Sequence, residues 1–230
     1  EGDIHRYNYR DCHLRTRKLA EMLQRLGVQP GMRVGTLAWN GYRHLELYFG
    51  VSGIGAVLHT INPRLHTEQL SWMINHAGDY IVCADLGMLP LVTAIAPHCP
   101  GVRHWIMLAD ADAMPAAPAG LTLLCYELLL QAEPGTLQWP SFDERSAAAL
   151  CYTSGTTGHP KGVLYSHRST LLHAFAGALP DGLGLSGADS ILPVVPMFHV
   201  NAWGLPYSCA AVGAKMVFPG PHLDGKNLHE

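Results

Sequence analysis

Residues 147–162 read AAALCYTSGTTGHPKG, an apolar run that leads into a loop rich in glycine and hydroxyl side chains, with a lysine at position 161. The run at 147–153 is expected to form a buried strand, and α/β folds place ligand loops directly after such strands. Glycines free backbone N–H groups, hydroxyls add donors and Lys161 brings a positive charge, a combination that suits a polyphosphate. No GxxxxGKS or GxxxxGKT spacing occurs, so this is not a Walker A loop. The alternative interpretation is an exposed turn of small residues.

Apolar runs alternate with segments of helical period along the rest of the chain. This alternation predicts an α/β fold with a largely parallel sheet. The first helix is expected to run from a cap at Asn8 to a stop at Gly27, residues 4–9 to form one arm of a hairpin, and the Ala- and Pro-rich residues 111–120 to be a surface excursion or a subdomain seam. Further strands are expected at 33–39, 56–60, 80–84, 104–108, 163–165 and 190–195, and further helices at 42–51, 68–75, 86–96, 126–131 and 168–179.

Composition excludes several classes of protein. The 230 residues are 48% hydrophobic and 14% charged with a formal net charge of -3, which argues against a disordered chain and against nucleic-acid binding. Six cysteines without a CxxC spacing predict free thiols and a cytoplasmic location, and 14 histidines show neither an i,i+4 pair nor HExxH. Residues 190–214 carry no charge, but three prolines among them favour a buried strand, a loop and a helix over a membrane span. We expect no signal peptide, and we expect the chain to be a piece of a longer protein.

The run YTSGTTGHPKGV at 152–163 resembles the signature loop of the adenylate-forming superfamily, which includes acyl-CoA synthetases, nonribosomal adenylation domains and luciferases. PMFH at 196–199 is similar to that family's second signature, and GMRV at 31–34 with the Asn62-Pro63 turn extends the resemblance over the whole chain. His159 and Ser154 depart from the residues that are common at their positions, although Ser154 preserves a hydroxyl. RHLE at 43–46, VLHTINPRL at 57–65 and VPMFHVNAW at 195–203 are most similar to bacterial medium- and long-chain fatty-acyl-CoA synthetases.

The resemblance implies the fold and the site. Residues 1–230 would be a partial N-terminal AMP-binding domain, with the rest of the large domain, the C-terminal lid domain, the adenine and ribose contacts and a catalytic C-terminal lysine outside them. Lys161 and His199 would be catalytic, and Thr153 would also help to place Mg²⁺. The acyl site would include His199, Val200 and Trp203, with Trp203 gating an alkyl tunnel. The loop that binds the phosphates of ATP would comprise Thr153, Ser154, Gly155, Thr156, Thr157, Gly158 and Lys161.

Each of these roles has a plainer alternative. Lys161 alone could be a solvated loop lysine, and His199 and Trp203 in their proline-flanked apolar stretch could be buried core residues. The function that the resemblance implies is a fatty-acid–CoA ligase of fatty-acid metabolism that uses ATP, Mg²⁺ and CoA, with these 230 residues alone inactive. A ligase for an aromatic or short-chain acid and a non-catalytic nucleotide- or acyl-binding module stay open. The expected partners are small molecules, not nucleic acid; peripheral membrane contact and a homodimer are left open.

Overall fold

A parallel sheet forms the centre of the molecule. The computed structural model describes residues 4–153, 160–221 and 225, and within these ranges a seven-stranded sheet has the order β5-β4-β3-β1-β2-β6-β7. Every neighbouring pair is parallel except β6 with β7, which is antiparallel. The predicted α/β fold with a largely parallel sheet is therefore confirmed. The strands are β1 (Arg33–Leu37), β2 (Val57–Thr60), β3 (Asp79–Asp85), β4 (His104–Leu108), β5 (Leu123–Cys125), β6 (Ala147–Thr153) and β7 (Lys161–Ser166).

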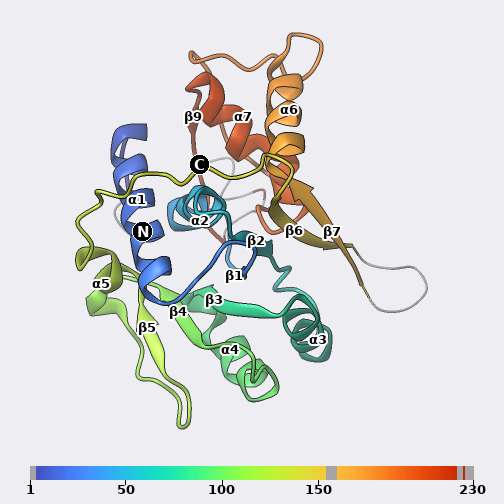
Figure 1. Ribbon diagram of the computed structural model, residues 1–230. Coiled ribbons are helices and arrows are strands. Elements are labelled where there is room, and N and C mark those ends of the chain that lie inside the picture. The colour runs from blue at the N-terminus through green and yellow to red at the C-terminus, as the bar shows by residue number, and fades with distance from the viewer. Residues whose placement is uncertain (1–3, 154–159, 222–224, 226–230) are drawn as a thin grey trace.

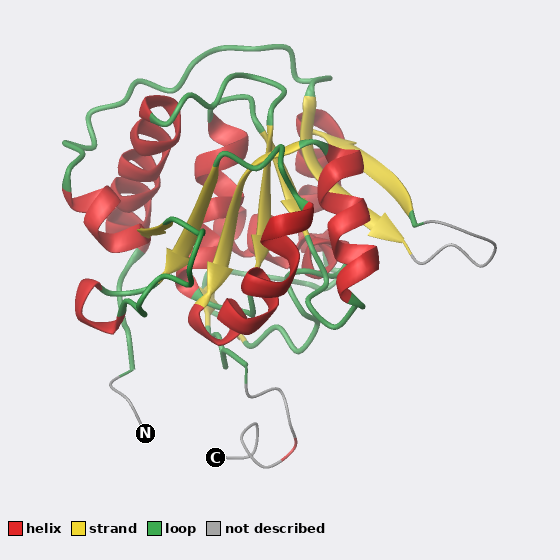
Figure 2. Cartoon of the chain, turned by 90° about the horizontal axis from the view of Figure 1, so that it is seen from below, coloured by secondary structure: helices red, strands yellow, loops and turns green. Residues whose placement is uncertain are grey.

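Helices cover both faces of this sheet, as Figures 1 and 2 show. The period of two along a strand sends Ile81 and Cys83 into one apolar core and Val82 and Ala84 into the other. Both faces are thus buried, which explains why the strands are continuous apolar runs. One face is covered by α1 (Tyr9–Arg25), α2 (Tyr42–Gly53) and α5 (Tyr126–Gln131), and the other by α3 (Thr67–Ala77), α4 (Leu89–Ile95) and the short turns η1 (Leu86–Met88) and η2 (Ala96–His98).

The end of the described chain packs beside the β6–β7 edge of the sheet. The helices α6 (His167–Ala178) and α7 (Leu205–Val212) lie against each other there (Figure 1). Two short strands, β8 (Ser190–Ile191) and β9 (Lys215–Met216), pair in parallel apart from the main sheet. No helix within the described ranges is long and apolar enough to cross a membrane.

Two expectations about local structure are wrong. Residues 4–8 form no strand, because the Asn8 side chain accepts the Asp11 N–H and starts α1 at Tyr9, while His5 stacks on the Tyr42 ring. The strand expected at 190–195 ends at Ile191. Beyond it, the carbonyls of residues 193 and 195 bind a side chain instead of a neighbouring strand.

A short strand and the segment that leads into it were not recognised from the sequence. The strand β5 was not predicted, although it pairs with β4 in the main sheet. Residues 111–120, which include the short turn η3 (Ala111–Ala113), therefore connect two adjacent strands of one sheet.

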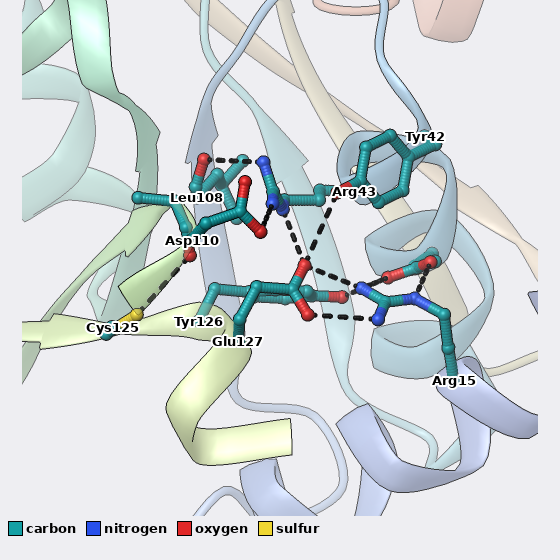
Figure 3. Close-up of polar contacts among 10 residues, drawn as sticks. Arg15, Tyr42, Arg43, Leu108, Asp110, Cys125, Tyr126 and Glu127 are labelled. Atoms are coloured by element: carbon teal, nitrogen blue, oxygen red, sulfur yellow. Dashed lines mark hydrogen bonds and ion pairs between the residues drawn. The ribbon is translucent and has the colours of Figure 1, made fainter. Parts of the chain in front are cut away.

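A buried network of charges ties α1, α2 and α5 together (Figure 3). Arg15 on α1 binds Glu46 on α2 at 2.6 Å and Glu127 on α5 at 2.8 Å, and Arg43 binds Glu127 at 2.7 Å. The Tyr126 hydroxyl donates to Glu46 at 2.7 Å. Burial raises the pKa of Glu127, but the hydrogen bonds from the two arginines outweigh it, so the net shift is downward. The network fixes the helices that cover one face of the sheet.

Candidate functional site

The phosphate-loop candidates that the structure describes meet at the carboxyl edge of the sheet. Because β6 runs parallel to β2, with Cys151 opposite Thr60, Thr153 ends its strand at the same edge as β1 to β4. Thr153 is paired with Lys161 in the antiparallel ladder, and its hydroxyl donates to the Lys161 carbonyl at 3.4 Å. Both residues are exposed. Ser154, Gly155, Thr156, Thr157 and Gly158 lie outside the described residues.

Tyr152 anchors the strand ends from which these residues project. Its hydroxyl lies 2.6 Å from Nδ1 of His76 on α3, and the Trp72 ring stacks on His76 at 4.5 Å. A Cβ at Gly162 would lie 3.3 Å from the Tyr152 ring, so the glycine lets that ring cover the first residues of β7. These contacts fix the end of β6 against α3, and the β6–β7 ladder sets the register of Thr153 with Lys161. The aromatic residue in front of the loop had not been singled out from the sequence.

A buried amide fixes the second motif at the same edge. Asn40, just beyond β1, donates through Nδ2 to the carbonyls of Pro193 at 2.8 Å and Val195 at 3.1 Å. Its Oδ1 accepts the Met197 N–H at 2.6 Å, and the Tyr48 hydroxyl donates to the Met197 carbonyl. Since the amide is satisfied on both sides, it specifies the path of the chain into His199.

The predicted acyl-site residues lie on an exposed left-handed turn. His199 is exposed, so the alternative interpretation of it as a buried core histidine is wrong, and Trp203 is 58% exposed and Val200 38% exposed. The turn η4 (Val200–Gly204) has φ values of 46°, 49°, 49° and 55° at its first four residues, none of which is glycine. Left-handed backbone costs an L-residue about 1–2 kcal/mol. Such strain persists only where the surrounding structure enforces it.

A buried polar cluster enforces this turn. The Asn201 Oδ1 accepts from the Cys151 thiol at 3.2 Å and from the Thr60 hydroxyl at 3.4 Å, and these two donors lie 3.0 Å apart. All three side chains are buried. Burial raises the pKa of the Cys151 thiol, although Thr60 and backbone groups of the turn lower it. The cluster joins β2, β6 and η4, so it brings the strand of the first motif against the second motif.

A cluster of aromatic and charged side chains that was not predicted also lies at this edge of the sheet. The Arg64 guanidinium lies 5.4 Å from the Trp39 ring centre and 5.6 Å from that of Phe198. The backbone N–H of Trp39 donates to the Asp85 carboxylate at 2.7 Å, and burial raises the pKa of Asp85 to about 6. The strand order reverses between β1 and β3, where these residues sit, and such switch points are where α/β sheets bind ligands. The signal in the sequence is an aromatic or acidic residue at the end of each of these two strands.

A cavity of about 390 Å³ lies away from this edge, between α1, α2, the segment at 139–142 and α6. Its lining is mainly apolar and includes Phe49, Trp139 and Phe142. None of the predicted site residues lines it, so its size alone does not make it the functional site. Within the described ranges, no group of three or more His, Cys, Asp or Glu side chains could hold a metal ion.

The fold and the edge define an α/β enzyme lobe with ligand groups at the carboxyl ends of its strands. The chain belongs to the AMP-binding enzyme family, whose model matches residues 2–230. It is 52% identical over 229 residues to a medium-chain-fatty-acid–CoA ligase from Ectopseudomonas oleovorans, covering 99% of this chain and 41% of that protein. It is 50% identical over 230 residues to a 3-methylmercaptopropionyl-CoA ligase from Ruegeria lacuscaerulensis, covering 99% of this chain and 42% of that one.

A solved structure shows the same fold. The crystal structure of an anthranilate CoA ligase in complex with anthranoyl-AMP superposes with a TM-score of 0.81 at 23% identity, over 96% of this chain and 41% of that one. The chain therefore spans about two-fifths of the length of the relatives it matches.

Proposed function

We propose that the full-length gene product carrying this chain is an AMP-forming acyl-CoA ligase for medium- or long-chain fatty acids. In the first step a carboxylate oxygen attacks the α-phosphate of ATP and pyrophosphate leaves. In the second, the CoA thiol attacks the acyl carbon and AMP leaves. The observation that carries the proposal is the junction at the sheet edge, where the strand of the Thr153–Lys161 pair contacts the turn of His199 and Trp203 through the Cys151–Asn201 bond.

Lys161 and Thr153 fit a polyphosphate. Negative charge grows on pyrophosphate as it departs, and a fixed cation at that place stabilises the transition state more than the ground state. Lys161 is exposed at the start of β7, and the backbone pairing with Thr153 holds its position. The Thr153 hydroxyl is a hard oxygen donor of the kind that Mg²⁺ accepts beside phosphate oxygens. When bound there, Mg²⁺ would neutralise phosphate charge.

His199, Val200 and Trp203 fit the acid. The imidazole of His199 offers a hydrogen-bonding group for a carboxylate, and the exposed Val200 and Trp203 side chains offer apolar surface for the carbon chain beside it. With 58% of its surface exposed in this chain, the Trp203 indole is not locked in a packed core, which fits a gate better than a core tryptophan.

Two alternative substrates and one alternative function stay open. The 3-methylmercaptopropionyl-CoA ligase, at 50% identity, favours a short acid as the second candidate, and an aromatic acid stays possible on the same residues. A binding module without chemistry would hold ATP or acid and release no pyrophosphate. A cytoplasmic location for the ligase is supported by six cysteines that are all free and buried.

Acid-dependent exchange between ATP and labelled pyrophosphate tests the proposal. The full-length gene product is assayed with saturated acids from four to sixteen carbons, with 3-methylmercaptopropionate and with benzoate. We expect exchange and CoA thioester with the longer saturated acids at the highest kcat/KM. A maximum at 3-methylmercaptopropionate or benzoate would reassign the substrate, and nucleotide binding without exchange would identify a module without chemistry.

A further inference from the structure

The buried cluster of Thr60, Cys151 and Asn201 lies at the junction of the two motifs. Cys151 precedes Thr153 by two residues along β6, and Asn201 follows His199 by two residues in the second motif. Their side chains bond directly, from Sγ to Oδ1 at 3.2 Å. Thr60, at the end of β2, completes the cluster through its hydroxyl. A rigid parallel sheet therefore supports both donors that hold Asn201.

The turn that carries Asn201 would not adopt its conformation unaided. Asparagine tolerates left-handed backbone better than most residues, but Val200, Ala202 and Trp203 beside it do not, and the β-branched Val200 is the least suited. The strain of four consecutive left-handed residues has to be balanced by contacts. The Asn201 side chain supplies buried polar contacts at the centre of the turn, where a lost partner would leave other groups unsatisfied.

A second contact joins the turn to α6. Gly204 has a φ of 75°, and a Cβ there would lie 2.7 Å from Nδ1 of the exposed His173 on α6, so glycine suits both the left-handed backbone and this close approach. The turn is therefore fixed by the sheet on one side and closed against α6 on the other. Trp203 lies between these two contacts and His199 precedes the first of them by two residues, and both side chains remain exposed.

We propose that Asn201, together with Cys151 and Thr60, positions the acyl-site turn relative to the strand end that carries Thr153 and Lys161. The inference rests on the proposed function. None of the three touches a reacting atom; they act through His199 on one side and through the strand end on the other. Their effect is to hold the bound carboxylate in line with the α-phosphate, where an error of about 1 Å costs about 10²-fold in rate.

Two substitutions at Asn201 separate tethering from relief of strain. Asn201→Ala removes the tether and keeps a side chain that disfavours left-handed backbone, whereas Asn201→Gly removes the tether and makes that backbone easy to adopt. If the side-chain bonds position the turn, both variants lower kcat for acid-dependent pyrophosphate exchange by about 10- to 100-fold. The KM for ATP changes little, because the phosphate loop belongs to β6 and β7.

Two substitutions at Cys151 test the other end of the bond. Cys151→Ser keeps a donor for the Asn201 oxygen and is expected to retain most of the activity, while Cys151→Ala is expected to reproduce the loss in Asn201→Ala. Cys99→Ala is the matched control, since Cys99 is a buried cysteine in the core under α4 and far from the cluster in the fold. Rescue by serine is a result that loss of core packing would not give.

The full-length gene product is measured for kcat, for KM of ATP and of the acid, and for melting temperature. An inactive wild-type protein would refute the proposed function and not this inference alone. With an active wild type, full activity in Asn201→Gly would show that backbone conformation, not the tether, matters and would overturn the proposal. Equal losses in Cys151→Ala, Cys151→Ser and Cys99→Ala would overturn it as well. If Asn201→Ala fails to fold, the comparison of the two Cys151 variants decides.

Discussion

Asp85→Asn is expected to stabilise the protein at neutral pH and to remove part of its pH dependence. Asp85 ends β3, and its Oδ2 accepts a hydrogen bond from the backbone N–H of Trp39 at 2.7 Å. Burial raises the pKa of this carboxyl from 3.8 to about 6, although the Trp39 N–H and Arg43 lower it. An asparagine keeps an oxygen that accepts the Trp39 N–H and does not titrate. The substitution therefore isolates the free energy of ionising a buried carboxyl.

The magnitude follows from the two pKa values. The folded protein binds the Asp85 proton more tightly than the unfolded chain, so this group favours folding most below pH 3.8. Its contribution falls as the pH rises to about 6 and is constant above that. One pKa unit corresponds to about 1.4 kcal/mol, so ionisation of Asp85 lowers the free energy of unfolding by on the order of 3 kcal/mol between low pH and pH 8. At pH 5 the protein has lost only about half of this stabilisation.

Urea unfolding of the wild-type protein and the Asp85→Asn variant at pH 5 and pH 8 measures this difference. The advantage of the variant should be larger at pH 8 than at pH 5 by about 1.5 kcal/mol. Because both proteins share every other titrating group, those groups cancel in the comparison. An advantage that is equal at the two pH values, or larger at pH 5, would show that Asp85 is not held in a buried, partly protonated state.

Three further substitutions test the site and the scaffold. Lys161→Ala should lower kcat for acid-dependent pyrophosphate exchange by about 10²- to 10³-fold while acid binding changes less, and an unchanged rate would remove Lys161 from the site. Arg15→Met should lower the free energy of unfolding by about 3–5 kcal/mol, because it leaves the fully buried Glu46 and its neighbour Glu127 without a shared cation; urea denaturation measures this, and a loss below about 1 kcal/mol would contradict it. Trp203→Ala should shift the melting temperature little, since the indole is 58% exposed, but should alter the chain-length profile of the acids; a large melting shift with an unaltered profile would assign Trp203 to packing.

The alternation of strands and helices could be predicted from the sequence because it depends on local periodicity. The strand at 33–39, the helix at 42–51 and the strand at 104–108 were placed to within a few residues, since buried parallel strands read as continuous apolar runs. The strand β5 is only three residues long and has too little pattern to be recognised. The strand expected at 190–195 is not formed beyond Ile191, because the carbonyls of Pro193 and Val195 accept hydrogen bonds from Asn40, a residue more than 150 positions earlier.

The site was predictable only in its residue types. The β6–β7 ladder brings Thr153 and Lys161 together. This pairing can be expected from the sequence, because two strands joined by one short loop commonly pair with each other. The left-handed residues 200–203 include no glycine or proline, and the side chains that hold them come from the distant strands β2 and β6, so the sequence alone did not indicate this conformation. Arg15, Glu46 and Glu127 are likewise far apart in the sequence, so their network could not be seen before the helices were placed.

Transfer of oxygen from the acid to AMP tests the central claim most directly. A saturated medium-chain fatty acid labelled with ¹⁸O in both carboxyl oxygens is incubated with the full-length gene product, ATP, Mg²⁺ and CoA. The masses of the products are then measured by mass spectrometry. Attack of the carboxylate on the α-phosphate, followed by cleavage of the acyl C–O bond by CoA, predicts one ¹⁸O atom in AMP and one in the thioester. Label in inorganic phosphate with ADP as the other product, or AMP without label, would contradict the account.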